Sequence, residues 1–240
     1  DGRLLKWNPN TGGTADTISA VITNAPTGCR GLIVTNERHL VALGASSDPR
    51  KVQWSDSENY TTWTPAATNA AGSLQLRTKG RITGAERWQT DILLFTTNGL
   101  HRMYYQGQPF VYGIQKAGES IGAIGKESIV NTSGFMVWMT ENGFVLYDGT
   151  VKPLECPVHD FIFDNLNRPF GAVTSGGHNG QWGEVIWFMP SGTSQTPNKY
   201  VIWNYKENLW SVGTTLQRVA WADEGAFALP LAASSDGHIY

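Results

Sequence analysis

The sequence is poor in charged residues, which make up 16% of its 240 residues. Lys and Arg number 18 and Asp and Glu number 20, so the formal net charge is −2. Tight general binding of nucleic acid needs clustered positive charge that displaces counterions from phosphates. The composition gives no such footprint, although a protein that surrounds DNA without gripping it remains compatible with it.

Cysteines and long apolar runs are also scarce. Cys29 and Cys156 are the only cysteines, which is too few for a disulfide framework. They could form one disulfide, but we expect small buried residues or inert thiols. No apolar run approaches the roughly 18 residues of a membrane span, and the opening residues show no signal-peptide pattern.

Glycine and aromatic residues are abundant instead. The chain holds 27 Gly and 10 Trp, and aromatic residues make up 11% of it. Few charges with many glycines and aromatics are typical of short strands joined by tight turns. The composition therefore predicts an all-β protein with no disordered segment.

A repeated unit organises the chain, made of an apolar run, a polar turn that ends in glycine, and a second run. The turn glycines of its four clearest copies are Gly99, Gly143, Gly192 and Gly237. Their spacings are 44, 49 and 45 residues. A looser copy, LIVTNERHLVAL, begins at Leu32. A regular period of this length is typical of β-propeller blades.

Each repeat predicts a β-hairpin. Asn98–Gly99 and Asn142–Gly143 are pairs that supply the positive φ angles of tight hairpin turns. On this basis Gly143→Val is expected to damage folding. The first run of each unit is almost continuously apolar, so its strand should be covered on both faces. We therefore expect a β-propeller of four-stranded antiparallel blades, with a long β-sandwich as the alternative.

We expect a single propeller over residues 1–240, incomplete at both ends because the first and last segments look like the same strand of two blades. The repeat units are expected at about 28–65, 80–118, 122–156, 170–213 and 216–240. One segment breaks the pattern: apolar residues at steps of three and four after Pro157 predict a short helix at about 158–167. The stretch GGHNGQWGE from Gly176 is expected to be a flexible loop.

The segment VQWSDSENYTTWTP holds Trp54 and Trp63 around a short acidic stretch. Asp56, Glu58 and Asn59 lack the spacing and the glycine of a divalent-cation loop. The segment also faintly resembles the Asp-box turn of sialidase propellers, without its glycine. A structural turn anchored by two tryptophans is the favoured interpretation.

Other candidate sites are incomplete. GESIGAIGKES from Gly118 departs from the phosphate-loop pattern at two positions. Cys156 and His159 have the spacing of half a zinc site, but the other half is missing. Asp160 and Asp164 would share a helix face, where solvated carboxylates are usual. We expect no enzyme, no metal and no cofactor.

The tryptophans could also be stacking platforms for sugars or single-stranded nucleic acid. Trp138, Trp187 and Trp203 lie inside apolar runs, where we expect them to pack between blades. Trp63, Trp88 and Trp210 lie near the expected strand ends, where exposure is conceivable. A core role is therefore favoured for most of the tryptophans.

Taken in order, these segments resemble the tail nozzle proteins of short-tailed bacteriophages, also described as tail tubular protein B or the packaged-DNA stabilisation hub. The resemblance runs from about Val52 to Tyr240. The residues that we expect to form its structural signature are Trp54, Ser55, Asp56, Trp63, Asn98, Gly99, Asn142, Gly143, Asp148 and Gly149. The helix that begins Pro-Val-His-Asp completes the set.

The resemblance implies a virion protein made in the host cytoplasm, with no catalytic residues to inherit. Six copies would form a ring below the portal and its adaptor, in contact with tail fibre, spike or needle proteins. The ring would pass double-stranded DNA without specific binding, which suits the near-neutral charge. The alternatives are a carbohydrate- or receptor-binding propeller, sialidase-like but non-catalytic, and a cellular protein-interaction propeller. The channel-lining residues cannot be read from the sequence.

Overall fold

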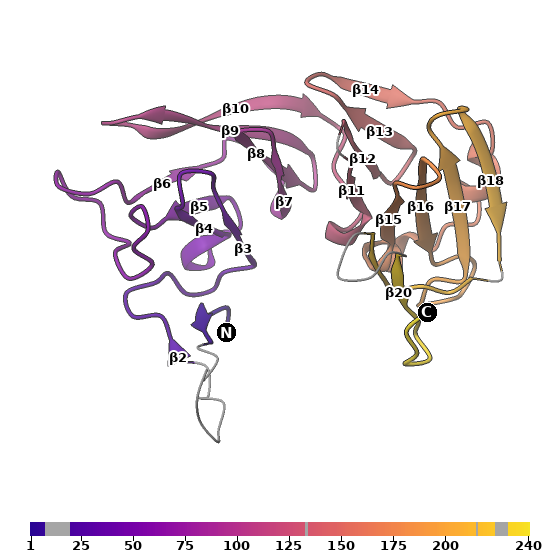
Figure 1. Cartoon of the computed structure of the whole chain (residues 1–240), viewed down its shortest axis with the longest axis horizontal. Helices are drawn as coiled ribbons and strands as arrows, with labels where there is room; N and C mark the ends of the chain where they lie inside the picture. The colour runs from indigo at the N-terminus through magenta and orange to yellow at the C-terminus, as the bar shows by residue number, and fades with distance from the viewer. Residues whose placement is uncertain (8–19, 133, 215, 224–229) are drawn as a thin grey trace. The chain divides into compact units, whose positions relative to one another are not determined.

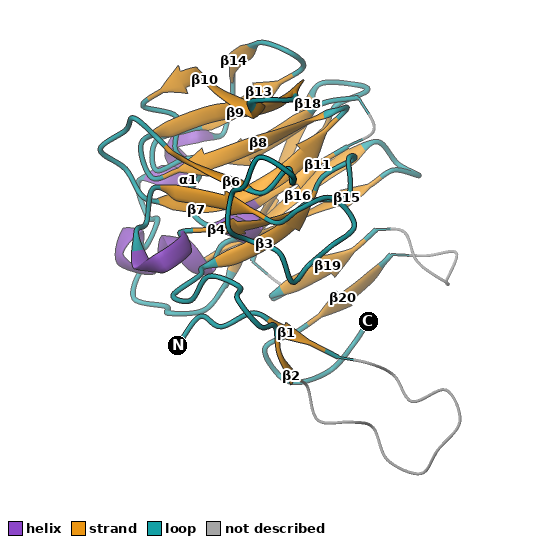
Figure 2. Ribbon diagram, turned by 90° about the vertical axis from the view of Figure 1, so that its left-hand side faces the viewer, coloured by secondary structure: helices purple, strands orange, loops and turns teal. Residues whose placement is uncertain are grey.

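The computed structural model describes residues 1–7, 20–132, 134–214, 216–223 and 230–240. Strands and bridges make up 45% of the described residues and helices 8%, so the protein is all-β, as Figure 2 shows in orange and purple. The chain divides into two compact units, Asp1–Glu119 and Ser120–Tyr240. Among the described residues, no helix is long and apolar enough to cross a membrane.

The first unit contains two four-stranded antiparallel sheets, which we name the first and second blades. The first blade consists of β3 (Gly31–Val34), β4 (Leu40–Leu43), β5 (Lys51–Trp54) and β6 (Gly72–Gln75). The second consists of β7 (Ile82–Trp88), β8 (Asp91–Thr96), β9 (Gly99–Gly107) and β10 (Val111–Glu119). A two-stranded ribbon joins β1 (Leu5–Lys6) to β2 (Ala20–Val21), and one 3₁₀ turn, η1, spans Ala45–Ser47.

The second unit has the same plan (Figure 1). The third blade consists of β11 (Ile129–Asn131), β12 (Met136–Met139), β13 (Phe144–Tyr147) and β14 (Val151–Leu154). The fourth consists of β15 (Ser175–Asn179), β16 (Glu184–Met189), β17 (Lys199–Asn204) and β18 (Leu209–Gly213), and β19 (Ala220–Ala222) pairs with β20 (Leu231–Ala233). In every blade the strands follow chain order, as consecutive hairpins do.

Two expected boundaries were wrong. The first repeat unit was expected at about 28–65. The fourth strand of the first blade, β6, begins only at Gly72, because a long loop separates β5 from β6. The stretch from Gly176 to Glu184 was expected to be a flexible loop, but its first four residues belong to strand β15, and only residues 180–183 form a turn before β16. Its glycines fit a strand because of close neighbours: a Cβ on Gly176 would lie 2.4 Å from Val130 Cγ2, and one on Gly177 would lie 2.3 Å from Trp221 Cγ. Tertiary packing therefore outweighs the weak strand propensity of glycine.

The second strand of each blade is the most deeply buried. All four residues of β12 and the last five of β16 are buried, in agreement with the continuous apolar runs in the sequence. In the second unit these strands contribute Val137, Met139, Val185 and Trp187 to one apolar core. In the first unit β4, β5 and β7–β10 form an equivalent core.

The helix is shorter than expected. Helix α1 covers His159–Phe163, and a 3₁₀ segment, η3, follows at Arg168–Val173, while another, η2, spans Lys126–Ser128. Ile162 and Phe163 are buried in the core of the second unit. Leu166, expected within the helix, instead forms an isolated bridge to Ser191.

The expected positive φ angles at the Asn-Gly turns were wrong. Neither Gly99 nor Gly143 has a positive φ angle, and neither do the asparagines before them. A threonine hydroxyl shapes each turn instead: Thr96 Oγ donates to the Gly99 carbonyl at 2.9 Å, and Thr140 Oγ donates to the Gly143 carbonyl at 2.9 Å. Such side-chain-to-backbone bonds stabilise turns without a left-handed residue.

A different device recurs between the third and fourth strands of three blades: an aromatic ring covers a glycine directly across the strand pair. The pairs are Trp54–Gly72, Tyr104–Gly113 and Tyr200–Gly213. A Cβ on these glycines would lie 2.4, 2.8 and 2.3 Å from the opposing ring. The absence of a side chain lets the ring lie flat on the strand, which offsets the low strand propensity of glycine.

This device predicts that Gly72→Val destabilises the protein, because the new side chain would overlap the buried Trp54 ring. We expect a loss of about 1–3 kcal/mol in the free energy of unfolding, as for overpacked cores. Urea unfolding followed by tryptophan fluorescence measures it. The matched control is Gly143→Val, where a Cβ meets no atom within 4 Å. A larger loss for the control would contradict both the packing argument and the revised turn geometry.

Candidate functional site

The residues around Trp54 serve the first blade. Trp54 is 3% exposed, and its indole N–H donates to the Ala70 carbonyl at 2.7 Å. Asp56 Oδ1 accepts the Ala70 N–H at 2.8 Å, so this carboxylate closes the loop before β6. Ser55 is buried, and its hydroxyl accepts the Leu40 N–H at 3.1 Å.

The second tryptophan of this segment has the same kind of role. Trp63 is 1% exposed and packs in a small apolar cluster with Ala42 and Ala45. Its indole N–H donates to the Tyr60 carbonyl at 2.7 Å. The segment that raised the possibility of a metal or sugar site is therefore a loop anchored on two buried indoles.

The Asp148–Gly149 turn is exposed and self-contained. Asp148 Oδ1 accepts the Thr150 hydroxyl at 3.0 Å, and Gly149 has a φ of 111°. A hydrogen bond from Lys152 holds the pKa of the Asp148 carboxyl below its usual range. The ten signature residues are brought together only in groups, as the anchors and turns of separate hairpins.

The incomplete zinc site gains no further ligand in the structure. Burial raises the pKa of the Cys156 thiol to about 11, which disfavours the thiolate that zinc requires. His159 Nε2 lies 3.1 Å from the Asn142 carbonyl, an arrangement that raises its pKa. Among the described residues, no group of three or more His, Cys, Asp or Glu side chains could hold a metal ion. Both cysteines are free, and burial also raises the pKa of Cys29.

Most tryptophans are buried. Trp138 and Trp187 are fully buried, and Trp88, expected near a strand end, is 8% exposed. Trp7 and Trp182 are different, with exposed fractions of 59% and 63%. No pattern around Trp7 or Trp182 distinguishes them from the other tryptophans in the sequence analysis above.

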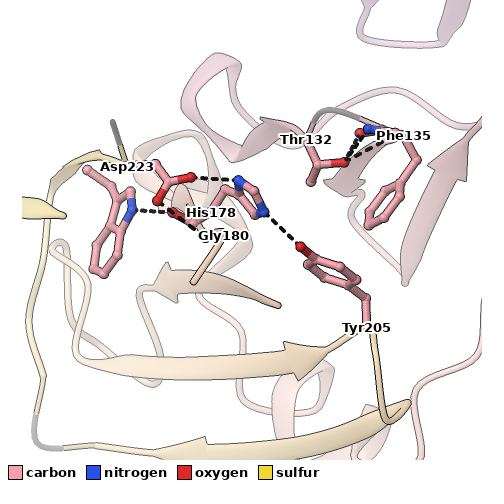
Figure 3. Close-up of polar contacts among 8 residues, drawn as sticks. Thr132, Phe135, His178, Gly180, Tyr205 and Asp223 are labelled. Atoms are coloured by element: carbon pink, nitrogen blue, oxygen red, sulfur yellow. Dashed lines mark hydrogen bonds and ion pairs between the residues drawn. The ribbon is translucent and has the colours of Figure 1, made fainter. Parts of the chain in front are cut away.

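The most connected polar cluster joins β15 to the end of β19 (Figure 3). His178 Nδ1 lies 2.6 Å from Asp223 Oδ2, and His178 Nε2 lies 3.1 Å from the Tyr205 hydroxyl. Asp223 Oδ1 also accepts the Gly180 N–H at 3.3 Å. The Trp221 indole N–H donates to the His178 carbonyl at 2.8 Å. These contacts tie the fourth blade to the β19–β20 pair.

A carboxylate, an imidazole and a hydroxyl in a row also form the order of an acid–base relay. The hydroxyl here belongs to Tyr205, and burial together with the Asp223 charge raises its pKa. The raised pKa favours the protonated phenol, and His178 bridges this hydroxyl to Asp223, so the three side chains link the end of β17 to the end of β19. The arrangement is therefore that of a structural clip. No short motif could have revealed it, because Asp223 lies 45 residues after His178.

A second histidine is buried without partners. His101, in β9, is 4% exposed and lies between Leu94 of β8 and Lys116 of β10. Neither of its ring nitrogens has a hydrogen-bond partner. Burial, and then the Lys116 charge, lower its pKa. The neutral ring is therefore strongly favoured in the folded protein.

The clip predicts that Asp223→Ala destabilises the second unit. The change leaves the His178 imidazole and the Gly180 N–H without their acceptor, which should cost about 1–3 kcal/mol. Chemical denaturation measures it. The matched control is Asp160→Ala, because the Asp160 side chain is 90% exposed. Equal stability of the two variants would refute a structural role for the Asp223 carboxylate.

His101 predicts a loss of stability in mild acid. Its pKa in the folded protein lies below the ordinary 6.5, so the unfolded chain binds the proton more readily. Stability is therefore complete above 6.5 and is lost as the pH falls through 6.5 toward the folded pKa. His101→Leu removes this proton while filling the same apolar site.

Urea unfolding at pH about 7.5 and about 5.5, on either side of the ordinary histidine pKa, should show a smaller acid loss for His101→Leu than for the unmodified protein. Comparing the two proteins cancels His159, whose raised pKa acts in the opposite direction. Parallel pH profiles would rule out a buried, neutral His101.

No protein-family model matches the chain, and no curated protein matches it. Solved structures are similar to it at very low identity. One is a protein of Bacteroides fragilis NCTC 9343 that is named as an exported protein, with 7% identity and a TM-score of 0.46 over 89% of this chain and 70% of that one.

Another is the dihydro-heme d1 dehydrogenase NirN in complex with DHE, which contains a β-propeller. The identity is 8% and the TM-score 0.51, over 89% of this chain and 43% of the dehydrogenase. This chain thus spans less than half the length of that enzyme. At such identity the likeness concerns the fold alone, and it agrees with the four-stranded meanders described above. The chain has the β-propeller fold, built of four-stranded antiparallel blades.

Proposed function

We propose that this protein is a structural virion component, a subunit of the tail nozzle of a short-tailed bacteriophage. The observation that carries the proposal is the ordered set of segments, from Trp54 to the helix after Pro157, that resembles the nozzle family. In this role the protein extends the channel below the portal and adaptor, retains the packaged genome and then conducts it during ejection.

The use of the signature residues supports a mechanical role. The polar atoms of Trp54, Asp56 and Trp63 form hydrogen bonds with backbone groups of their own loop. The His178, Asp223 and Tyr205 side chains likewise hydrogen-bond to one another and link β15 to the end of β19. Side chains that are committed to packing and turn formation stabilise a scaffold, which is what a conduit under pressure requires.

The charge distribution also supports a conduit. Each Lys or Arg that contacts phosphate adds a counterion-release gain, which would slow the sliding of DNA. Several basic side chains are instead paired with carboxylates: Arg38 with Glu58, Arg102 with Asp91, Lys116 with Glu119 and Lys152 with Asp148. Pairing of this kind lowers the positive potential that a passing duplex would meet.

The proposal includes a homohexamer, with neighbours among the adaptor and the fibre, spike or needle proteins. Six identical subunits in head-to-tail contact close a ring around a central channel. The family resemblance carries this number. In the proposed ring each subunit contributes its propeller as one module.

The exposed Trp182 favours a second candidate, a carbohydrate- or receptor-binding propeller. Its indole is 63% exposed on the hairpin between β15 and β16. Exposed indoles provide flat apolar faces on which sugar rings can stack. A single exposed indole is weaker support than the ordered segments.

Cryo-electron microscopy of nuclease-treated native particles tests the two candidates. We expect this chain in a six-fold ring around a channel wide enough for a DNA duplex, with six copies per particle by quantitative mass spectrometry. Absence from particles freed of host proteins would end the virion proposal. A trace in a peripheral fibre or spike would instead favour glycan binding, and Trp182→Ala would then be the variant to compare on a glycan array.

A further inference from the structure

Among the described residues, the last strand of each blade pairs with another strand on one side only. These strands are β6, β10, β14 and β18. An unpaired edge is a template on which another chain can add a strand, so proteins usually protect it with charges, prolines, bulges or short polar strands. The four edges of this protein differ in how far they are protected.

Three of the edges carry such protection. β14 contains Lys152 and Pro153. β10 contains Lys116 and two register shifts along its pairing with β9. β6 is short, and its exposed residues, Ser73 and Gln75, are polar. Each of these features disfavours the addition of a further strand.

The edge of β18 has none of the charges, prolines or register shifts seen in β10 and β14, although its Ser211 is exposed and polar. Its five residues, Leu-Trp-Ser-Val-Gly, include no charged residue and no proline. Its register with β17 runs without a shift from Leu209 to Gly213. Leu209 is 59% exposed, although it is a large apolar side chain. This edge is regular, uncharged and partly apolar.

The strand is also held rigidly in place. Trp210 and Val212 pack against the core of the second unit, and Trp210 stacks on Trp203 with ring centroids 5.9 Å apart. The Tyr200 ring covers Gly213 at the end of the strand. A preorganised edge loses little conformational entropy when a strand is added to it, which favours binding.

We propose that β18 is a docking edge that accepts an extended, uncharged strand from a different protein chain. Backbone hydrogen bonds along Leu209–Gly213 supply the pairing, and an apolar side chain of the incoming strand covers Leu209. The edge carries no charge, so a complementary strand needs none. The choice of a different chain rests on the proposed function, because two β18 edges paired with each other would close a two-fold dimer, which a single six-membered ring does not accommodate.

The purified chain and a synthetic peptide test this docking edge without any virion. The probe is a fluorescein-labelled, C-terminally amidated peptide with the sequence of residues 200–204, the uncharged part of β17 that β18 already pairs with on its other edge. We expect saturable binding by fluorescence anisotropy and slower amide hydrogen exchange at Leu209–Gly213. The same peptide with proline in place of Ile202 should not bind, because proline lacks the N–H that the ladder needs.

Ser211→Lys should weaken peptide binding roughly tenfold or more, because a charge on an edge strand opposes pairing. The matched control is Ser73→Lys on β6, where we expect no change in binding; near-equal melting temperatures establish that both variants fold. Absence of peptide binding to the unmodified chain, or equal loss in both variants, would overturn the proposal. Concentration-dependent dimers that Ser211→Lys abolishes would show that a second copy is the partner, and would overturn it as well. These outcomes do not depend on whether particles contain the chain.

Discussion

The deep burial of the second strand in each blade is the constraint on which the rest of the structure depends. Strand β12 offers no solvent-facing side, so it must lie between apolar layers. Buried indoles then need acceptors for their N–H groups. Trp138 donates to the Ile121 carbonyl, Trp187 of β16 donates to the Ser128 carbonyl at the start of the third blade, and Trp221 donates to the His178 carbonyl. The last two of these bonds link consecutive sheets of the second unit. The need of the indoles for acceptors therefore also helps to align these sheets with one another.

The abundance of glycine follows from the same packing. Three blades place an aromatic ring over a glycine on the neighbouring strand, and β15 uses Gly177 to admit the Trp221 ring. In each case the glycine provides room for a large ring close to the backbone rather than a left-handed turn. The chain is therefore rich in both residue types for one reason: aromatic rings fill the space between and over short strands, and glycines make room for these rings.

The sequence reveals features that are local and periodic, and hides those that depend on distant neighbours. The apolar runs around Met136 and Val185 identify the buried strands, and their spacing indicates the propeller. The positive φ angles predicted for the Asn-Gly turns were wrong because the Thr96 and Thr140 hydroxyls form the hydrogen bonds that close these turns. A hairpin closed by a hydroxyl does not need a positive φ angle. Strand β15 was not predicted because its glycines are required by close contacts with side chains of other strands, which the local sequence does not reveal. The His178–Asp223 pair is absent from any short pattern for the same reason.

The way that polar groups are used bears directly on function. A binding or catalytic site needs polar side chains that are left free to meet a ligand. In the part of the chain that the structure describes, Asp56 closes a loop, Asp148 forms a turn, and Asp223 orients an imidazole whose other nitrogen meets a protonated phenol. The β18 edge and the exposed indole of Trp182 present backbone groups and an aromatic face to other molecules. Exposed backbone and aromatic faces are groups that other protein chains can contact, and this supports the proposal of an assembly subunit.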